Sequence, residues 1–135
     1  MTTISTAGVH HVALTVSDVK RSQQFYTELL GFNHLTDFGP RVLLHNGSVL
    51  LGMGTAPDPA QAQANDRFNE NRIGLDHLSL SVASMADIEA ALALLDANGV
   101  PHGDILRLDA FGIVVLAFRD PDNIQVELTA PIETH

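Results

Sequence analysis

Two segments of the chain alternate strictly between apolar residues and small or polar residues. In residues 9–16 the apolar set is Val12, Leu14 and Val16, and the opposite set is His11, Ala13 and Thr15. In residues 74–82 the apolar set is Leu78, Leu80 and Val82, and the opposite set is His77, Ser79 and Ser81. A period of two is typical of a β-strand with one covered face. Each segment is therefore predicted to be a strand whose other face, headed by a histidine, lines a cavity.

The segment after the first predicted strand has the pattern of a helix followed by three short strands. Ser17 or Asp18 is suited to cap the helix, and Gly31 is suited to end it in a left-handed conformation. Apolar runs at residues 32–35, 41–45 and 48–53 predict the three strands, and Asn46-Gly47 is a strong hairpin signal.

The second half of the chain repeats this order. A helix is predicted to begin at Ser84 and to end at Gly99, with a buried face made of Ile88, Ala91, Leu92, Leu94 and Leu95. Strands are predicted at residues 104–108, 113–118 and 124–129. The sequence thus predicts an α+β fold of two βαβββ modules, at residues 8–53 and 74–130, within one domain spanning residues 1–135. Residues 54–73 are interpreted as a connector, or alternatively as a flap that carries Phe68 and Arg72 into a pocket.

Composition narrows the classes of function. The 135 residues are 45% hydrophobic, which is enough for a packed core, and the net charge is −9. Such an acidic chain repels phosphate backbones and anionic lipids, so nucleic-acid and membrane-surface binding are disfavoured. There is no cysteine, which leaves histidine and carboxylates as candidate metal ligands. No secretory signal or membrane-spanning run is present, so a cytoplasmic protein is expected.

The last predicted strand carries a carboxylate among apolar residues. Glu127 alternates with Val126 and Leu128, so it belongs to a polar row, as His11 and His77 do in their own strands. Three candidate ligands in corresponding places of a duplication favour a metal site. If no metal binds, the same three side chains are expected to form a buried hydrogen-bonded cluster.

These motifs resemble the vicinal oxygen chelate superfamily, which includes glyoxalase I, extradiol dioxygenases, fosfomycin-modifying transferases and bleomycin-binding resistance proteins. The resemblance rests on His11-Val12-Ala13-Leu14, Leu29-Leu30-Gly31-Phe32, Asp76-His77-Leu78, and the run from Phe118 to Glu127. It implies an open, cupped, eight-stranded barrel-like sheet with helices outside. It also implies one divalent metal ion held by His11, His77 and Glu127. The family's fourth ligand falls at Leu51 or Gly52, neither of which binds metal.

Two histidines and one carboxylate suit Fe, and more generally Mn, Ni, Co or Zn. The resemblance therefore implies an enzyme that binds a small oxygenated metabolite to the metal through vicinal oxygens. Its reaction is that of a lyase or isomerase, a ring-cleaving dioxygenase or a thiol transferase. The alternative is a non-catalytic protein that sequesters a small molecule in the manner of antibiotic resistance proteins.

Other side chains are given secondary roles. His45 is the best further candidate for a catalytic acid or base, beside Glu127. His10 is interpreted as structural, facing the covered side or a strand edge, and Arg119 as a support for the turn that follows it. The resemblance also implies a homodimer, in which the two modules pair within one chain or exchange between subunits.

Overall fold

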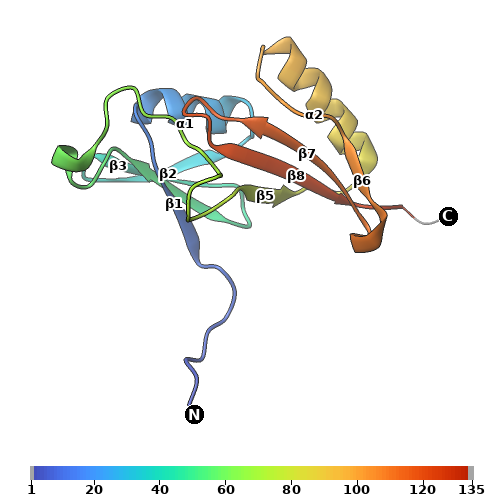
Figure 1. Cartoon of the computed structure of the whole chain (residues 1–135), viewed down its shortest axis with the longest axis horizontal. Helices are drawn as coiled ribbons and strands as arrows, with labels where there is room; N and C mark the ends of the chain where they lie inside the picture. The colour runs from blue at the N-terminus through green and yellow to red at the C-terminus, as the bar shows by residue number, and fades with distance from the viewer. Residues whose placement is uncertain (1, 134–135) are drawn as a thin grey trace. The chain divides into compact units, whose positions relative to one another are not determined.

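The structure is a computed structural model that describes residues 2–133. The chain divides into two compact units, Met1–Gln63 and Ala64–His135, which are described separately. Each unit contains one four-stranded sheet and one α-helix, in the order strand, helix, three strands (Figure 1). The prediction of two βαβββ modules in an α+β fold is therefore confirmed. Within the described residues, neither helix is long and apolar enough to cross a membrane.

The first unit has the strand order β1-β4-β3-β2, with β1 parallel to β4 and the other pairs antiparallel. Its elements are β1 (His11–Thr15), α1 (Val19–Glu28), β2 (Asn33–Phe38), β3 (Arg41–His45), β4 (Leu50–Gly54) and the short 3-10 helix η1 (Pro59–Gln61). Asp18 caps α1 by accepting a hydrogen bond from the backbone N–H of Arg21, and Gly31 follows the helix at a φ of 73°.

The core of the first unit lies between α1 and one face of its sheet. Tyr26 of α1 is fully buried, and its ring meets the ring of Phe32 edge to face at a centroid distance of 6.1 Å. Leu44, Leu51 and Met53 form the covered face of the sheet and are also fully buried. Because side chains alternate along a strand, the neighbouring residues of β3 and β4 point to the opposite, uncovered face.

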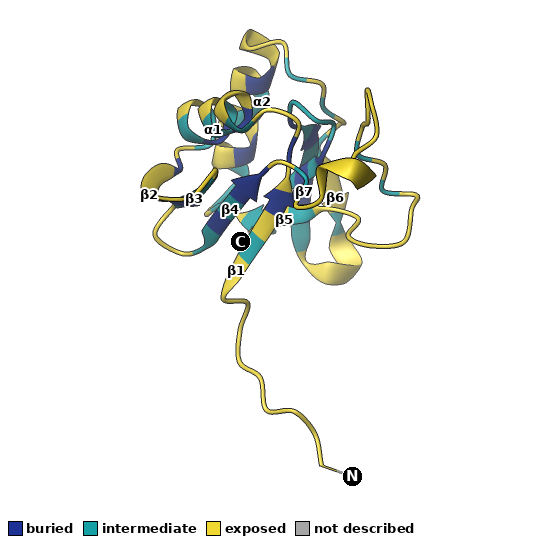
Figure 2. Cartoon of the chain, turned by 90° about the vertical axis from the view of Figure 1, so that its left-hand side faces the viewer, coloured by how far each residue is buried: buried dark blue, intermediate teal, exposed yellow. Residues whose placement is uncertain are grey.

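The second unit has the equivalent strand order, β5-β8-β7-β6, with β5 parallel to β8. Its elements are β5 (Leu78–Ser81), α2 (Met85–Ala97), β6 (Leu106–Leu108), the 3-10 helix η2 (Asp109–Phe111), β7 (Ile113–Arg119) and β8 (Gln125–Pro131). Ser84 and Asp87 form the capping box that begins α2. Ile88 and Leu95 bury one side of α2, whose other side is exposed (Figure 2).

The structure corrects details of the sequence-based elements. Leu94, predicted on the buried face of α2, is 53% exposed, because six residues after Ile88 it lies about a third of a turn away from the buried stripe. The strand predicted from residue 48 begins at Leu50, because the Asn46 side chain accepts hydrogen bonds from the backbone N–H groups of Ser48 and Val49. The strand predicted at residues 32–35 runs from Asn33 to Phe38.

The end of the connector is fixed to the second unit. The Arg119 guanidinium donates two hydrogen bonds to the Glu70 carboxylate, at 2.7 and 2.8 Å, and a third to the carbonyl of Asn123 at 3.2 Å. The backbone N–H of Phe68 donates to the carbonyl of Asp122, and the Asn123 side chain donates to the carbonyl of Phe68. We call these contacts the connector clamp. Arg119 thus supports the β7–β8 turn, as expected, and also holds the chain that leads to β5.

The connector clamp is expected to make stability depend on acid. Hydrogen bonding to Arg119 lowers the pKa of Glu70 from 4.5 to about 2. A carboxyl group with a lowered folded-state pKa stabilises the fold above its unfolded pKa and loses that effect as the pH falls toward the folded value. Glu70→Gln should therefore lower the thermal midpoint at pH 7, and the difference from wild type should vanish between pH 4.5 and about 2. Glu89→Gln on α2 is the control. A pH-independent difference would contradict the assignment.

Candidate functional site

The polar side chains of β5 and β8 form one continuous surface in the second unit. Parallel pairing places Ser79 beside Glu127 and Ser81 beside Thr129. His77 directly precedes β5 and, by alternation, belongs to the same face. The apolar residues between them, including Val126 and Leu128, are buried on the other face. The predicted polar row is therefore confirmed as one side of this sheet, and we call it the polar face of the second unit.

His77 and Glu127 face each other at a separation that suits a shared metal ion. The His77 Nε2 and Glu127 Oε1 atoms are 3.7 Å apart, and the two side chains are 38% and 18% exposed. Metal–ligand bonds of about 2.1 Å place two adjacent ligand atoms roughly 3.0 to 3.4 Å apart. The observed separation is too long for a hydrogen bond and only slightly wider than a metal needs. These two residues thus fit a divalent metal without rearrangement of the backbone.

The His77 ring is oriented by Asp76. The Asp76 Oδ1 atom lies 2.8 Å from His77 Nδ1 and also accepts a hydrogen bond of 2.9 Å from the Gln125 side chain. In a neutral imidazole, a proton on Nδ1 satisfies this contact with the carboxylate and leaves the Nε2 lone pair directed toward Glu127. Sequence analysis missed this role of Asp76 and Gln125. The available signals were the carboxylate next to the histidine and the polar residue two positions before Glu127.

The Glu127 carboxylate is also fixed by hydrogen bonds from neighbouring hydroxyl groups. The Thr129 hydroxyl donates to Glu127 Oε1 at 3.2 Å, and the Ser79 hydroxyl is hydrogen-bonded to that of Thr129. These contacts fix the carboxylate while leaving its second oxygen, Oε2, available. The polar face therefore contains an oriented nitrogen donor and an oriented oxygen donor on neighbouring strands.

The first unit repeats this register with different side chains. Ala13, two residues after His11, pairs with Gly52, just as Ser79, two residues after His77, pairs with Glu127. Gly52 is therefore the counterpart of Glu127, whereas Leu51 faces the core and is fully buried. A Cβ atom built on Gly52 would have no contact shorter than 3.9 Å. The first unit thus leaves an unfilled position where the second unit has its carboxylate.

The register also places the other candidates of the first unit. His11 pairs with Leu50, and Leu50 pairs with His45, so the two histidines lie on one face and in one row of the sheet. Two strand spacings correspond to about 10 Å between their Cα atoms. His10 is exposed just before β1, and its Nδ1 atom lies 2.9 Å from His11 Nδ1. His10 is therefore an exposed residue whose ring is hydrogen-bonded to that of its neighbour, in keeping with a structural role.

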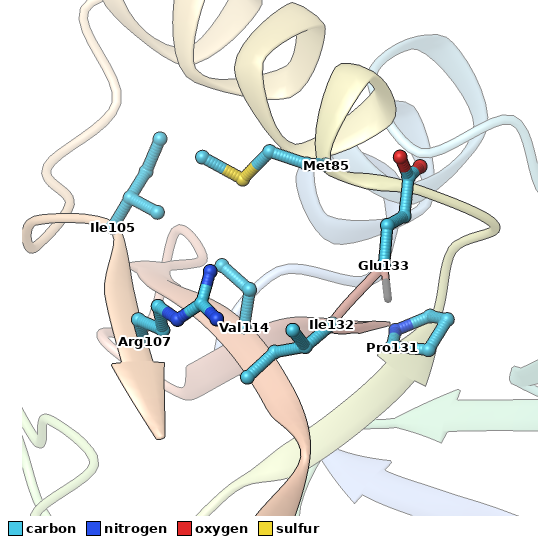
Figure 3. Close-up of a pocket in the computed structure, with 7 residues that line it drawn as sticks. All are labelled: Met85, Ile105, Arg107, Val114, Pro131, Ile132 and Glu133. Atoms are coloured by element: carbon cyan, nitrogen blue, oxygen red, sulfur yellow. The ribbon is translucent and has the colours of Figure 1, made fainter. Parts of the chain in front are cut away.

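The predicted ligand set is divided between the two units. His77 and Glu127 are brought together in the second unit, and His11 belongs to the first. Within residues 2–133, no group of three or more histidine or carboxylate side chains is already gathered around one point. A separate pocket of about 470 Å³ lies in the second unit, where Met85, Ile105 and Ile132 surround Arg107 (Figure 3). Arg107 is paired with Asp109, and none of the predicted ligands lines this pocket.

The role of Asp76 can be tested without changing either candidate ligand, His77 or Glu127. In Asp76→Asn the amide either accepts or donates, so the proton position on His77 is no longer fixed. We expect about a tenfold loss of affinity for Co²⁺. This is the smaller of the losses usually seen when a carboxylate that orients a metal-binding histidine is removed. Long-range ¹⁵N NMR of the metal-free protein should show the Nδ1-protonated ring in wild type and a tautomer mixture in the variant. Asp66→Asn, in the connector, is the control. Identical His77 spectra would contradict the assignment.

Comparisons with known proteins agree with this architecture. Residues 8–128 match the family model described as the Glyoxalase/Bleomycin resistance protein/Dioxygenase superfamily. The uncharacterised protein YaeR of Escherichia coli is 30% identical over 128 residues, covering 89% of this chain and 93% of that protein. A crystal structure of a glyoxylase/bleomycin resistance protein/dioxygenase domain from Frankia sp. EAN1pec is 34% identical, with a TM-score of 0.79 and coverage of 97% and 96%.

A more distant structure shares the fold. Lactoylglutathione lyase from Agrobacterium tumefaciens is 20% identical, with a TM-score of 0.73 and coverage of 93% of this chain and 95% of that one. At this identity the similarity concerns the fold alone. The duplicated βαβββ modules, the polar face of the second unit and the family match together show that this chain belongs to the Glyoxalase/Bleomycin resistance protein/Dioxygenase superfamily.

Proposed function

We propose that the protein is a divalent-metal-dependent enzyme that acts on a small oxygenated metabolite bound through vicinal oxygens. His11, His77 and Glu127 are the proposed metal ligands. The observation that supports this best is the pairing of His77 Nε2 with Glu127 Oε1 at 3.7 Å, with both side chains held from behind. Members of this superfamily typically use a divalent metal ion.

The donor set limits the choice of metal. Two imidazoles and one carboxylate, without a thiolate, suit Fe²⁺, Mn²⁺, Ni²⁺, Co²⁺ or Zn²⁺. Gly52 supplies no ligand at the position equivalent to Glu127, so further coordination positions stay open for substrate oxygens. When bound there, the ion would supply Lewis acidity that polarises an oxygen of the substrate.

The protein's own side chains would bind and orient the substrate beside this centre. His45 shares a row with His11 and is half-buried, which suits it to give or take a proton at a substrate oxygen or carbon. Glu127 is proposed both as a ligand and as a carboxylate whose Oε2 is available to the substrate. We further propose a cytoplasmic homodimer, in line with the family resemblance.

A second candidate function is non-catalytic sequestration of a small molecule. The net charge of −9 favours a cationic ligand. Aromatic residues make up only 5% of the chain and there is no tryptophan, so stacking walls for such a ligand are sparse. The oriented histidine–carboxylate pair therefore favours the enzyme.

Elemental analysis of protein purified without chelators tests this proposal. We expect one divalent ion for each proposed site. The protein should either retain this ion through purification or take it up during dialysis against a solution of one of the candidate metals. Metal-loaded protein should then bind a small chelating probe such as oxalate, and metal-free protein should not. A wild-type protein that takes up no divalent ion would overturn the metal-dependent enzyme and leave sequestration as the better explanation.

A further inference from the structure

Arg41 stands on the same face of the first unit as the proposed ligand His11. It is the first residue of β3 and follows the turn Gly39-Pro40. Side chains alternate along β3, so the buried Leu44 faces the core, and Arg41, Leu43 and His45 face the other way. Arg41 is half-buried in this position.

The Arg41 side chain lies across β4 at Gly54. A Cβ atom built on Gly54 would lie 2.6 Å from Arg41 Cγ, 3.2 Å from Nε and 3.3 Å from Cζ. Any side chain at residue 54 would thus displace the arginine. Gly54 is two residues beyond Gly52, which corresponds to about 7 Å along the strand. The guanidinium is therefore held near the unfilled position at Gly52, opposite Ala13.

The charge of Arg41 has no protein partner in the part of the chain that the structure describes. Its guanidinium forms no hydrogen bond or ion pair there, although the chain carries 16 acidic residues. By contrast, Arg119 is bound to Glu70 and Arg107 to Asp109. A partly desolvated cation without a counter-charge costs free energy, so this guanidinium is suited to bind an anion supplied from outside.

The internal duplication allows Arg41 and Gly54 to be compared with their counterparts in the second unit. Leu43 pairs with Gly52, and Ala117 pairs with Glu127, so Arg41 corresponds to Val115 and Gly54 to Thr129. The second unit uses these places for an apolar residue and for the threonine that holds Glu127. At the same two places the first unit has Arg41, which is unpaired in the described part of the chain, and Gly54. The two modules have therefore diverged at equivalent positions of their sheets.

We infer that Arg41 determines specificity by binding a second, anionic group of the substrate. This inference rests on the proposed function, in which the substrate's vicinal oxygens bind the metal. The substrate class is then a small hydroxy or oxo acid that carries a further carboxylate or similar anion several ångströms from its chelating end. A guanidinium binds such a group through two parallel hydrogen bonds.

Two probes that differ only in the remote anion test this inference. 2-Hydroxybutyrate and 2-hydroxyglutarate share the same chelating hydroxy acid, and only the second has a distal carboxylate. Binding to the Co²⁺-loaded protein is measured by calorimetry. We expect wild type to prefer 2-hydroxyglutarate by about tenfold and Arg41→Gln to lose this preference. Arg67→Gln, which removes the same charge from the connector, should keep it.

A second variant displaces Arg41 without removing it. Gly54→Ala forces the arginine aside, whereas Gly103→Ala adds a methyl group whose nearest contact is 3.9 Å away. The first variant should lose the preference and the second should keep it. In metal-free protein, 2-hydroxyglutarate should shift the Arg41 Nε–Hε resonance, which tests the anion site independently of metal.

The outcomes separate the two proposals. Loss of metal uptake, with the Arg41 resonance still responding to 2-hydroxyglutarate, overturns the proposed metal enzyme but not the anion site. Normal metal uptake with equal affinity of wild type for both probes, or with the same preference in Arg41→Gln, overturns the inference about Arg41.

Discussion

Replacing His77 by alanine is expected to lower the affinity for a divalent metal by at least about 100-fold, because one of the three proposed ligands is lost. Removing a residue that hydrogen-bonds to a metal ligand already lowers metal affinity by about 10- to 100-fold. The His77 side chain is 38% exposed, so the free energy of unfolding of the metal-free protein should change by no more than about 0.5 kcal/mol. Isothermal titration with Co²⁺, together with chemical denaturation, measures both quantities.

The matched control for this result is His34→Ala. His34 is an exposed histidine of β2 that is paired with Asp37, so the variant removes an imidazole without touching a proposed ligand. It should bind metal as tightly as wild type does. If His77→Ala kept a full complement of tightly bound metal, the ligand set proposed here would be wrong.

Introducing glutamate at Gly52 is expected to strengthen metal binding. The position corresponds to Glu127 in the register, its φ is not in the left-handed region, and an added Cβ atom would meet nothing closer than 3.9 Å. A fourth, charged ligand should contribute about 2 kcal/mol, comparable to a strong charge-assisted hydrogen bond. This corresponds to roughly a 30-fold lower Kd. The same substitution should weaken oxalate binding, because it fills a position otherwise open to substrate oxygens.

Gly52→Gln separates charge from bulk in this experiment. It has nearly the same size and shape as the glutamate variant but adds no negative charge, so its metal affinity should stay close to that of wild type. A Gly52→Glu protein that folds normally and binds metal no better than Gly52→Gln would show that residue 52 does not face the metal.

Much of the fold was predictable because local patterns fix it. The alternation around His11 and His77, the caps of both helices and the Asn46-Gly47 turn each act over a few residues. The same alternation correctly placed Glu127 on a polar face. Leu94 was misplaced because residues 90–95 of α2 are all apolar, so the sequence there marks no clear boundary to the buried stripe.

The support of the site was harder to predict because it depends on contacts between distant residues. The bond between Gln125 and Asp76 joins residues 49 positions apart, as does the bond between Arg119 and Glu70. The choice of Gly52 over Leu51 needed the pairing of β1 with β4, since a shift of one residue exchanges the two faces. Nothing in the sequence marked Arg41 as a functional residue. Its lack of an ion-pair partner among the described residues becomes visible only in the folded sheet.

The connector clamp also determines which part of the linking segment is able to vary. Since Phe68 and Glu70 are fastened to the β7–β8 turn, the stretch between Thr55 and Arg67 alone sets the reach of one module from the other. The length of this stretch can change through evolution or engineering without shifting His77. The reason is that the connector clamp fixes the chain between this stretch and His77. The reach of such a tether decides between closure within one chain and exchange of modules between subunits, so the length of this stretch would set that choice in the proposed homodimer.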